Sequence, residues 1–176
     1  MTTNADNAGE AARERGTPLE NAPDPGLGNE PVAKERYTDA EFMRQEWEHI
    51  WTKVWLVGCL ERDLDEPGAY CATEIGPESI LLIRQDDGSV RAFFNVCQHR
   101  GNRLRDRGLG HATTFKCAYH HWEYKLDGSF ENIPDLETFP QGAPCKGLEE
   151  IPCDVWNGWV WFSLNSEVEP LAEYLN

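Results

Sequence analysis

Two pairs of possible metal ligands lie close together in the middle of this chain. Cys97 and His99 are separated by one residue, and Cys117 and His120 are separated by two. Deprotonated cysteine and neutral histidine are both strong ligands for zinc and iron. Two thiolates and two imidazoles on two short loops can therefore hold one metal centre.

The spacing within each pair bears on the kind of centre. A structural zinc site is one candidate, because two Cys and two His suit tetrahedral zinc, but such sites usually begin with a Cys-x2–4-Cys pair. Here each pair mixes Cys with His. In a Rieske-type [2Fe–2S] cluster two His bind one iron and two Cys bind the other. The pattern favours the iron–sulfur cluster, with structural zinc as the alternative.

The sequence around the ligands resembles the N-terminal Rieske domain of ring-hydroxylating oxygenase alpha subunits. The resemblance is carried by H-R-G after the first Cys, by Y-H-H-W around the second His, and by flanking stretches such as V-W-L-V-G, P-G-A-Y, L-D-G-S-F and G-W-V-W-F-S-L. It implies that Cys97 and Cys117 bind one iron, and His99 and His120 the other. His121 stands where the family commonly has Gly and is a rival ligand, although the spacing favours His120.

The same resemblance implies an oxidoreductase component that transfers electrons. A ferredoxin or flavin reductase would donate electrons to the cluster, and His120 is the candidate exit toward a mononuclear iron in a neighbouring subunit of a homotrimer. That Fe(II) site uses two His five positions apart, and no pair among His49, His111 and His121 has this spacing. We therefore expect no catalytic residue here, and the mononuclear iron only in an absent catalytic domain. The substrate, and the choice between dioxygenase, monooxygenase and demethylase chemistry, stay open.

A stand-alone electron carrier that resembles a Rieske ferredoxin is the alternative function. Rieske proteins of respiratory complexes are a poorer match. Their loops are joined by a disulfide, which would need Cys where Asn102 and Tyr119 stand, and they carry a Ser where His121 stands. Fewer hydrogen-bond donors to the cluster sulfurs lower the reduction potential. We expect a potential toward the low end of the Rieske range.

The ligand loops are locally basic. They contain Arg100, Arg103, Arg105, Arg107 and Lys116, with Asp106 as an acidic neighbour. Two interpretations stay open: these side chains pair with the many carboxylates elsewhere in the chain, or they dock an acidic electron donor.

Composition excludes some partners. Acidic residues outnumber basic ones by 31 to 16 among 176 residues, for a net charge of −15, which argues against nucleic acid. No apolar run approaches the length of a membrane span, so we expect no membrane partner and a cytoplasmic protein. The remaining cysteines are predicted to be free and inert; they are Cys59, Cys71, Cys145 and Cys153.

Residue patterns divide the chain into four parts. Residues 1–36 are predicted to be a disordered arm. A helix is expected within 37–53, started by a capping box of Thr38 and Glu41 and with a core-facing apolar stripe. Residues 54–166 form the expected Rieske domain, and 167–176 begin a linker toward the absent catalytic domain.

Short strands are expected throughout the Rieske domain. Apolar patterns and turn signals predict them at 54–57, 70–75, 80–84, 90–95, 123–126, 129–131, 154–156 and 159–164, and Phe115 and Lys116 are expected to lead into the second ligand loop. Asp-Asp-Gly, Asp-Gly and Asn-Gly turns predict hairpins between neighbouring strands. The expected fold is mainly β, a small antiparallel sandwich or barrel that carries the two ligand loops at one tip.

Overall fold

The computed structural model describes residues 31–143 and 147–175, and the chain divides into two units, 1–38 and 39–176. The described part of the first unit contains one short helix, α2 (Glu35–Thr38). Most of the predicted arm at 1–36 lies outside the described residues, and so does Cys145. The rest of this section concerns the second unit.

The predicted N-terminal helix is present but changes character part-way. It begins as α3 (Ala40–Glu46) and continues as the π-helical turn η1 (Trp47–Trp51). Asp39 is its N-cap, and its carboxylate accepts the backbone N–H of Phe42 at 2.9 Å. The predicted capping box, which began one residue earlier at Thr38, is therefore wrong, because the carboxylate of Asp39 satisfies the first turn instead.

The apolar stripe of this helix is not part of the core, contrary to the prediction. No residue of α3 or η1 is buried, and Met43 and Ile50 are 56% and 45% exposed. The ring of Trp47 lies so close to Gly76 that a side chain at Gly76 would collide with it. Phe42, Trp47 and Trp51 are half-buried, so the aromatic residues of the stripe pack partly while its aliphatic residues are exposed.

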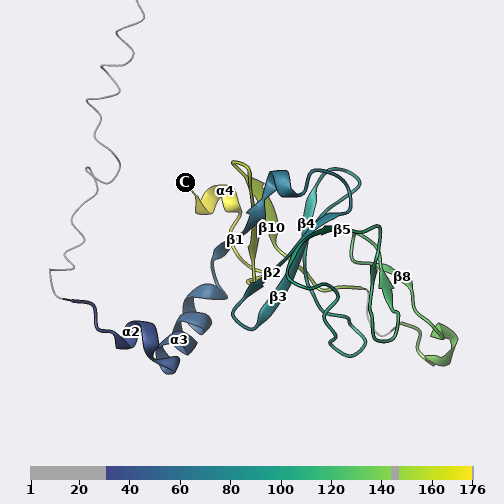
Figure 1. The fold of residues 1–176 in the computed structure, drawn as a ribbon, viewed down its shortest axis with the longest axis horizontal. Coiled ribbons are helices and arrows are strands. Elements are labelled where there is room, and N and C mark those ends of the chain that lie inside the picture. Colours follow the sequence, from purple (N-terminus) through teal and green to yellow (C-terminus); the bar gives the residue numbers. More distant parts are fainter. Residues whose placement is uncertain (1–30, 144–146, 176) are drawn as a thin grey trace, which may run out of the picture. The chain divides into compact units, whose positions relative to one another are not determined.

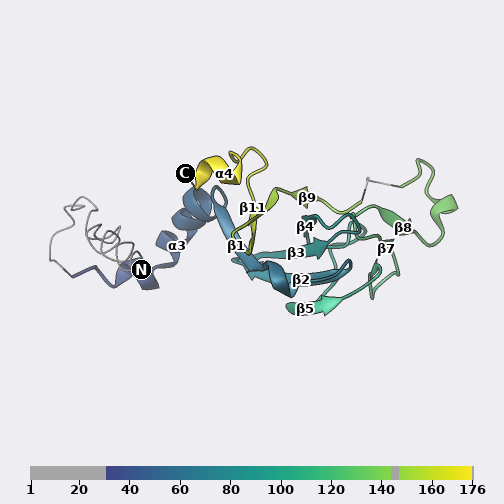
Figure 2. The ribbon, with the colours of Figure 1, turned by 90° about the horizontal axis from the view of Figure 1, so that it is seen from above.

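Three antiparallel sheets form the rest of this unit (Figure 1). The first has the order β1-β11-β10, with β1 Trp55–Leu60, β10 Cys153–Trp156 and β11 Trp159–Ser163. The second has the order β5-β2-β3-β4-β9, visible in Figure 2, with β2 Ala69–Ile75, β3 Glu78–Arg84, β4 Val90–Phe94, β5 Gly108–His111 and β9 Glu150–Ile151. The third has the order β6-β7-β8, with β6 Phe115–Lys116, β7 Glu123–Tyr124 and β8 Phe130–Asn132. Short helical turns are η2 Glu61–Asp63, η3 Leu136–Thr138 and α4 Leu171–Tyr174.

Turn chemistry explains the hairpins that the sequence predicted. The β3–β4 and β7–β8 hairpins turn at Asp-Gly-Ser sequences, where the carboxylate of Asp87 or Asp127 accepts both the N–H and the O–H of the following Ser. Asn157 and Gly158 both have positive φ, 49° and 79°, between β10 and β11, as a type I′ turn requires. All three predicted hairpins are confirmed, and so is the mainly β antiparallel class.

The sheets enclose two hydrophobic cores. The larger, here called the ligand-side core, lies beneath the two ligand loops and includes the aromatic residues Phe93, Phe115, Trp122 and Tyr124. The other lies between the first two sheets, around residues such as Ile80, Leu82, Val160 and Phe162. Among the described residues, no helix is long and apolar enough to cross a membrane.

Candidate metal centre

The first ligand loop follows β4 and is closed by its own backbone. An isolated antiparallel bridge joins Val96 to Arg103 across the base of the loop. Inside it, the N–H of Cys97 donates to the carbonyl of Asn102 at 2.8 Å, and the N–H of Gly101 donates to the carbonyl of Cys97 at 2.9 Å. Gly101 has φ 69°, the left-handed conformation that turns the chain back.

The second ligand loop repeats these bonds between β6 and β7. The N–H of Cys117 donates to the carbonyl of Trp122 at 2.8 Å, and the N–H of His121 donates to the carbonyl of Cys117 at 3.1 Å. His121 has φ 61° and takes the place that glycine has in the first loop. Two equivalent loops therefore present their cysteines and the residues after them to one another.

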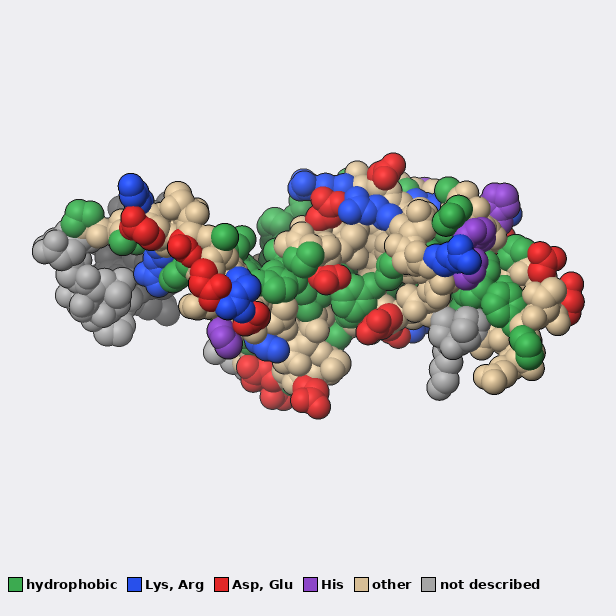
Figure 3. Space-filling view, turned by 90° about the horizontal axis from the view of Figure 1, so that it is seen from below, with side chains coloured by type: hydrophobic (Ala, Val, Ile, Leu, Met, Phe, Trp, Pro, Cys, Tyr) green, Lys and Arg blue, Asp and Glu red, His purple; other side chains and the backbone are tan. Residues whose placement is uncertain are grey.

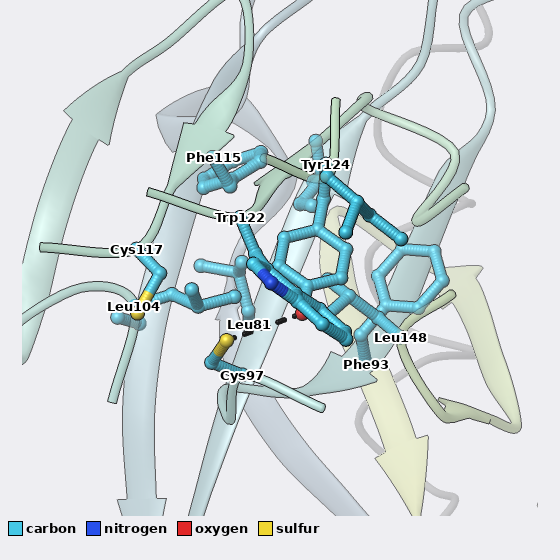
Figure 4. Close-up of a cluster of buried hydrophobic side chains, with 12 residues drawn as sticks. Leu81, Phe93, Cys97, Leu104, Phe115, Cys117, Trp122, Tyr124 and Leu148 are labelled. Atoms are coloured by element: carbon cyan, nitrogen blue, oxygen red, sulfur yellow. Dashed lines mark hydrogen bonds between the residues drawn. The ribbon is translucent and has the colours of Figure 1, made fainter. Parts of the chain in front are cut away.

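The loops bring all four predicted ligands together. Cys97 and Cys117, one from each loop, are almost fully buried within the ligand-side core (Figure 4). The imidazoles of His99 and His120 lie edge to face with ring centroids 4.5 Å apart. The donors thus form a sulfur pair and an imidazole pair, which is the division of ligands in a Rieske [2Fe–2S] cluster.

Other possible ligands are not part of this arrangement. The side chain of His121 is exposed to solvent, whereas His120 is half-buried between His99 and Tyr119, with ring centroids 4.5 and 3.8 Å away. Within residues 31–143 and 147–175, no set of three or more His, Cys, Asp or Glu side chains surrounds a single point as ligands of one metal ion.

One ring nitrogen of His99 lacks a hydrogen-bond partner. Nδ1 of His99 is buried and has no hydrogen-bond partner, and such atoms are rare unless an ion or water completes them. The ring stacks on Trp122, with centroids 4.7 Å apart and planes 10° apart. Because Trp122 is itself 2% exposed, the core fixes the orientation of His99. A buried, oriented and unpaired nitrogen fits a bond to metal.

Each cysteine sulfur also has a side-chain partner. The hydroxyl of Tyr124 lies 3.2 Å from Sγ of Cys97 and accepts the backbone N–H of Gln98 at 2.9 Å (Figure 4). Because that N–H occupies the oxygen as an acceptor, the hydroxyl proton is available to the sulfur. Nδ2 of Asn102 donates to Sγ of Cys117 at 3.8 Å. Neither donor was assigned a role from the sequence. The one sequence signal for Tyr124 is that it lies two residues after Trp122, so that on a strand both side chains face the same side.

Electrostatics differ between the two thiols. Burial raises the pKa of Cys97, against the opposing effect of the Tyr124 hydroxyl. Burial also acts to raise the pKa of Cys117, but the backbone N–H groups of Tyr119 and His120, together with the side chains of Cys97 and Asn102, leave that pKa below its usual value. Hydrogen bonds to the thiolate favour the charged form that binds metal.

A buried amide supports the first loop from below. Asn95 is 2% exposed; its Nδ2 donates to the hydroxyl of Ser79 at 3.0 Å and to the carbonyl of Arg105 at 2.7 Å, and its Oδ1 accepts the N–H of Arg105 at 3.0 Å. In the sequence, Asn95 is only the last residue of a predicted strand. It joins both ends of the first loop to β3.

The basic residues of the loops fall into two groups. Arg103 pairs with Glu74, and Lys116 with Glu123, while the guanidinium of Arg105 donates to the carbonyls of Leu104, Thr114 and Lys116 and lies over the ring of Phe115. Arg100 and Arg107 are exposed. The space-filling view shows histidine, basic and apolar side chains side by side on one face (Figure 3).

The described cysteines outside the loops are free, as predicted. They are Cys59, Cys71 and Cys153. The two ligand loops carry no disulfide at Asn102 and Tyr119, and both ligand cysteines are free thiols.

Comparison with known families agrees with this geometry. Residues 54–152, more than half of the chain, match the family model described as "Rieske [2Fe-2S] domain". The chain belongs to the Rieske [2Fe–2S] domain family. The matched residues include both candidate ligand loops.

The similar curated proteins are large oxygenase components. The chain is 34% identical over 143 residues to that of the 2,4-dinitrotoluene dioxygenase system from Burkholderia sp. (strain RASC), covering 79% of this chain and 32% of the relative. It is 33% identical over 141 residues to that of the naphthalene 1,2-dioxygenase system from Pseudomonas putida, covering 78% and 31%. The chain thus spans about a third of the length of these relatives, which are oxidoreductases.

Solved structures give the same result. A naphthalene 1,2-dioxygenase mutant bound to phenanthrene matches with a TM-score of 0.72 and 31% identity over 78% of this chain and 32% of that one. The apo form of a quaternary ammonium Rieske monooxygenase matches with a TM-score of 0.76 and 28% identity over 82% and 43%. The described fold is that of the Rieske region of such oxygenases.

Proposed function

We propose that this chain is the electron-transferring Rieske segment of an aromatic-ring-hydroxylating-type oxygenase alpha subunit. The observation that carries the proposal is the meeting of a buried cysteine pair with an imidazole pair on two equivalent loops. The similarity to large oxygenase components supports the assignment to this class of enzyme.

Cys97 and Cys117 bind one iron of the cluster, and His99 and His120 bind the other. When bound, the cluster supplies a one-electron carrier. The buried position of both sulfurs keeps water from the thiolates, and the stacking of His99 on Trp122 holds its Nδ1 toward the inside of the site. His120 is the electron exit, because its ring lies between His99 and the exposed ring of Tyr119.

The partners of the segment follow from the same assignment. A ferredoxin or flavin reductase donates electrons, and the exposed Arg100 and Arg107 are the basic residues of the loops that meet its acidic surface. The electrons pass to a mononuclear Fe(II) in a catalytic domain outside this chain, in a homotrimeric cytoplasmic enzyme. The named aromatic substrates of the relatives suggest hydroxylation of an aromatic ring.

Metal analysis tests the cluster. Protein purified without oxygen is expected to contain about two irons and two acid-labile sulfides per chain, with little zinc. His120→Ala is expected to lose the cluster, and His121→Ala, as the matched control, to keep it. Zinc without sulfide would overturn the proposal, and a cluster that survives in His120→Ala but not in His121→Ala would reverse the ligand assignment.

Electron transfer needs a separate measurement. The loaded protein is mixed with a reductase and ferredoxin of a ring-hydroxylating system, and bleaching of the cluster is followed by stopped flow. Reduction that slows with rising salt supports docking through Arg100 and Arg107. If ferredoxin and reductase reduce the loaded cluster no faster than it is reduced in buffer alone, the oxygenase role is excluded.

A further inference from the structure

Asn102 contacts both ligand cysteines, although it is not a ligand. Its backbone carbonyl accepts the N–H of Cys97 at 2.8 Å, within the first loop. Its side-chain Nδ2 lies 3.8 Å from Sγ of Cys117, in the second loop. The residue is half-buried, and Cys117 is 1% exposed, so this contact is shielded from bulk water. Asn102 is thus a direct polar link between the two loops.

A neighbouring carbonyl determines which end of the amide faces the sulfur. Nδ2 of Asn102 also donates to the carbonyl of Arg103 at 2.8 Å. A carbonyl can only accept, so the NH2 end, and not Oδ1, must point to this side. One amide proton serves Arg103, and the same nitrogen has a second proton for Cys117. The amide is therefore oriented as a donor before any cluster is present.

We propose that Asn102 is a positioning residue that raises the reduction potential of the cluster through an N–H···S bond to Cys117. This inference rests on the proposed function. Reduction adds negative charge to the cluster, and a hydrogen bond to an ionised sulfur strengthens as that charge grows. The donor therefore stabilises the reduced form more than the oxidised form. Tyr124 acts on the sulfur of Cys97 in the same sense, so each thiolate of one iron has one side-chain donor.

The link also explains how the loops stay together without a covalent bond. Both ligand cysteines are free thiols, and Asn102 and Tyr119 stand where a disulfide would join the loops. The hydrogen bond from Asn102 to the opposite cysteine replaces that connection, and it acts on the sulfur that carries the charge. One side chain thereby couples loop closure to the redox state.

Two amide-to-leucine variants test the proposal. Asn102→Leu keeps the size of the side chain and removes the donor. Gln98→Leu is the matched control, because the amide of Gln98 belongs to the same loop but donates to the carbonyl of Val96 at 3.3 Å. Iron and sulfide content, the EPR spectrum of the reduced cluster and a dye-linked redox titration are measured for each loaded protein.

At a fixed solution potential, Asn102→Leu is expected to lower the ratio of reduced to oxidised cluster about three- to tenfold, where tenfold corresponds to roughly 59 mV for a one-electron couple. Gln98→Leu is expected to change it less than about twofold. Asn102→Asp, which also lacks the donor and adds negative charge, should lower the ratio further. Normal iron and sulfide in Asn102→Leu with an unchanged potential overturns the inference, and so does an equal shift in Gln98→Leu.

A measurement on the wild-type protein does not depend on how the variants fold. With 15N in the side-chain amides of asparagine, pulsed EPR of the reduced cluster is expected to show a 15N coupling from Asn102. Absence of that coupling overturns the inference even if both variants fail to load. Absence of iron and sulfide from the wild type would instead contradict the proposed function, so the two failures are distinguishable.

Discussion

Gly101 and His121 occupy the same position in the two ligand loops. Each donates its backbone N–H to the carbonyl of the cysteine four residues before it, at 2.9 and 3.1 Å, and each has a left-handed conformation, with φ of 69° and 61°. Glycine adopts this conformation freely, whereas a residue with a Cβ is strained by about 1–2 kcal/mol. The second loop therefore carries a local strain that the first avoids.

Replacing His121 by Gly is expected to stabilise the protein. The side chain of His121 is exposed, so its removal loses little packing, and relief of strain should raise the free energy of unfolding by about 1 kcal/mol, or Tm by about 2–4 °C. Gly101→Ala should lower Tm by a similar amount, because open space surrounds the new Cβ and only φ is unfavourable. Calorimetry of the three proteins measures this. A lower Tm for His121→Gly would show that its imidazole stabilises the loop.

Two Asp-Gly-Ser turns offer a matched pair for testing core packing. Gly88 and Gly128 have nearly equal φ, 84° and 80°. A Cβ at Gly88 would meet nothing within 4 Å, whereas one at Gly128 would lie 2.6 Å from the ring of Phe93. Gly88→Ala should therefore cost only the strain of its conformation, about 1 kcal/mol.

Gly128→Ala should cost roughly 1–3 kcal/mol more than Gly88→Ala, because the ring of Phe93 is 1% exposed and has little room to move. Urea or thermal unfolding of both variants measures the difference. Equal losses would mean that Phe93 shifts without cost and that the ligand-side core is loosely packed beneath this turn.

Much of the fold was predictable because its signals are local. Asn157-Gly158 and the two Asp-Gly-Ser turns require special backbone conformations that few residue pairs supply, and they fix three hairpins. The strands β5, β6 and β9 were not predicted, because two of the four residues of β5 are glycines, and β6 and β9 have only two residues each. None of them carries an alternating pattern.

The meeting of the four candidate ligands was predictable from the sequence, and the residues that support them were not. Cys97 and His120 belong to a short pattern of rare residue types, whereas Asn95 and Asn102 matter only through partners that the fold brings to them. The prediction that the apolar stripe of the N-terminal helix faces the core was wrong for the converse reason. Its periodicity is helical, but burial depends on what lies opposite, and Met43 and Ile50 are exposed.

Arg105 is expected to stabilise the fold rather than to bind a partner. Its guanidinium donates to the carbonyls of Leu104 and Thr114 at 2.8 and 3.0 Å and lies 4.9 Å from the ring centroid of Phe115. Arg105→Ala leaves those carbonyls without their donor and should lower the free energy of unfolding by about 1–3 kcal/mol. Thermal unfolding of the loaded protein measures the change.

Arg107→Ala is the control for this prediction, because Arg107 is exposed on the same stretch of chain. Its effect on Tm should be small, about 0.5 kcal/mol or less in free energy. If Arg105→Ala leaves Tm unchanged but slows reduction by a ferredoxin as strongly as Arg107→Ala does, Arg105 belongs to the docking surface after all.

Cys153 is expected to react with alkylating agents only at high pH. Burial first, and then the carboxylates of Asp154 and Glu150, raise its pKa to about 12. The thiolate is the nucleophile, so alkylation of the folded protein should rise with each pH unit and reach no plateau below about pH 11. In an unfolded chain the pKa is about 8.5. Folding thus favours the thiol, and this contribution to stability is complete below about pH 8.5 and lost as the pH rises toward 12.

Alkylation with iodoacetamide, resolved by peptide mass spectrometry, measures this pH dependence. The same protein in urea is the control, where the reaction at Cys153 should level off between about pH 9 and 10 because burial and the two carboxylates no longer act. A plateau near pH 9 in the folded protein would contradict the prediction, since it would mean that water reaches the sulfur where Cys153 packs against the second core. If the raised pKa is correct, a Cys153→Ala variant should lose less stability than the wild type between pH 9 and 11, because it has no thiol to ionise on unfolding.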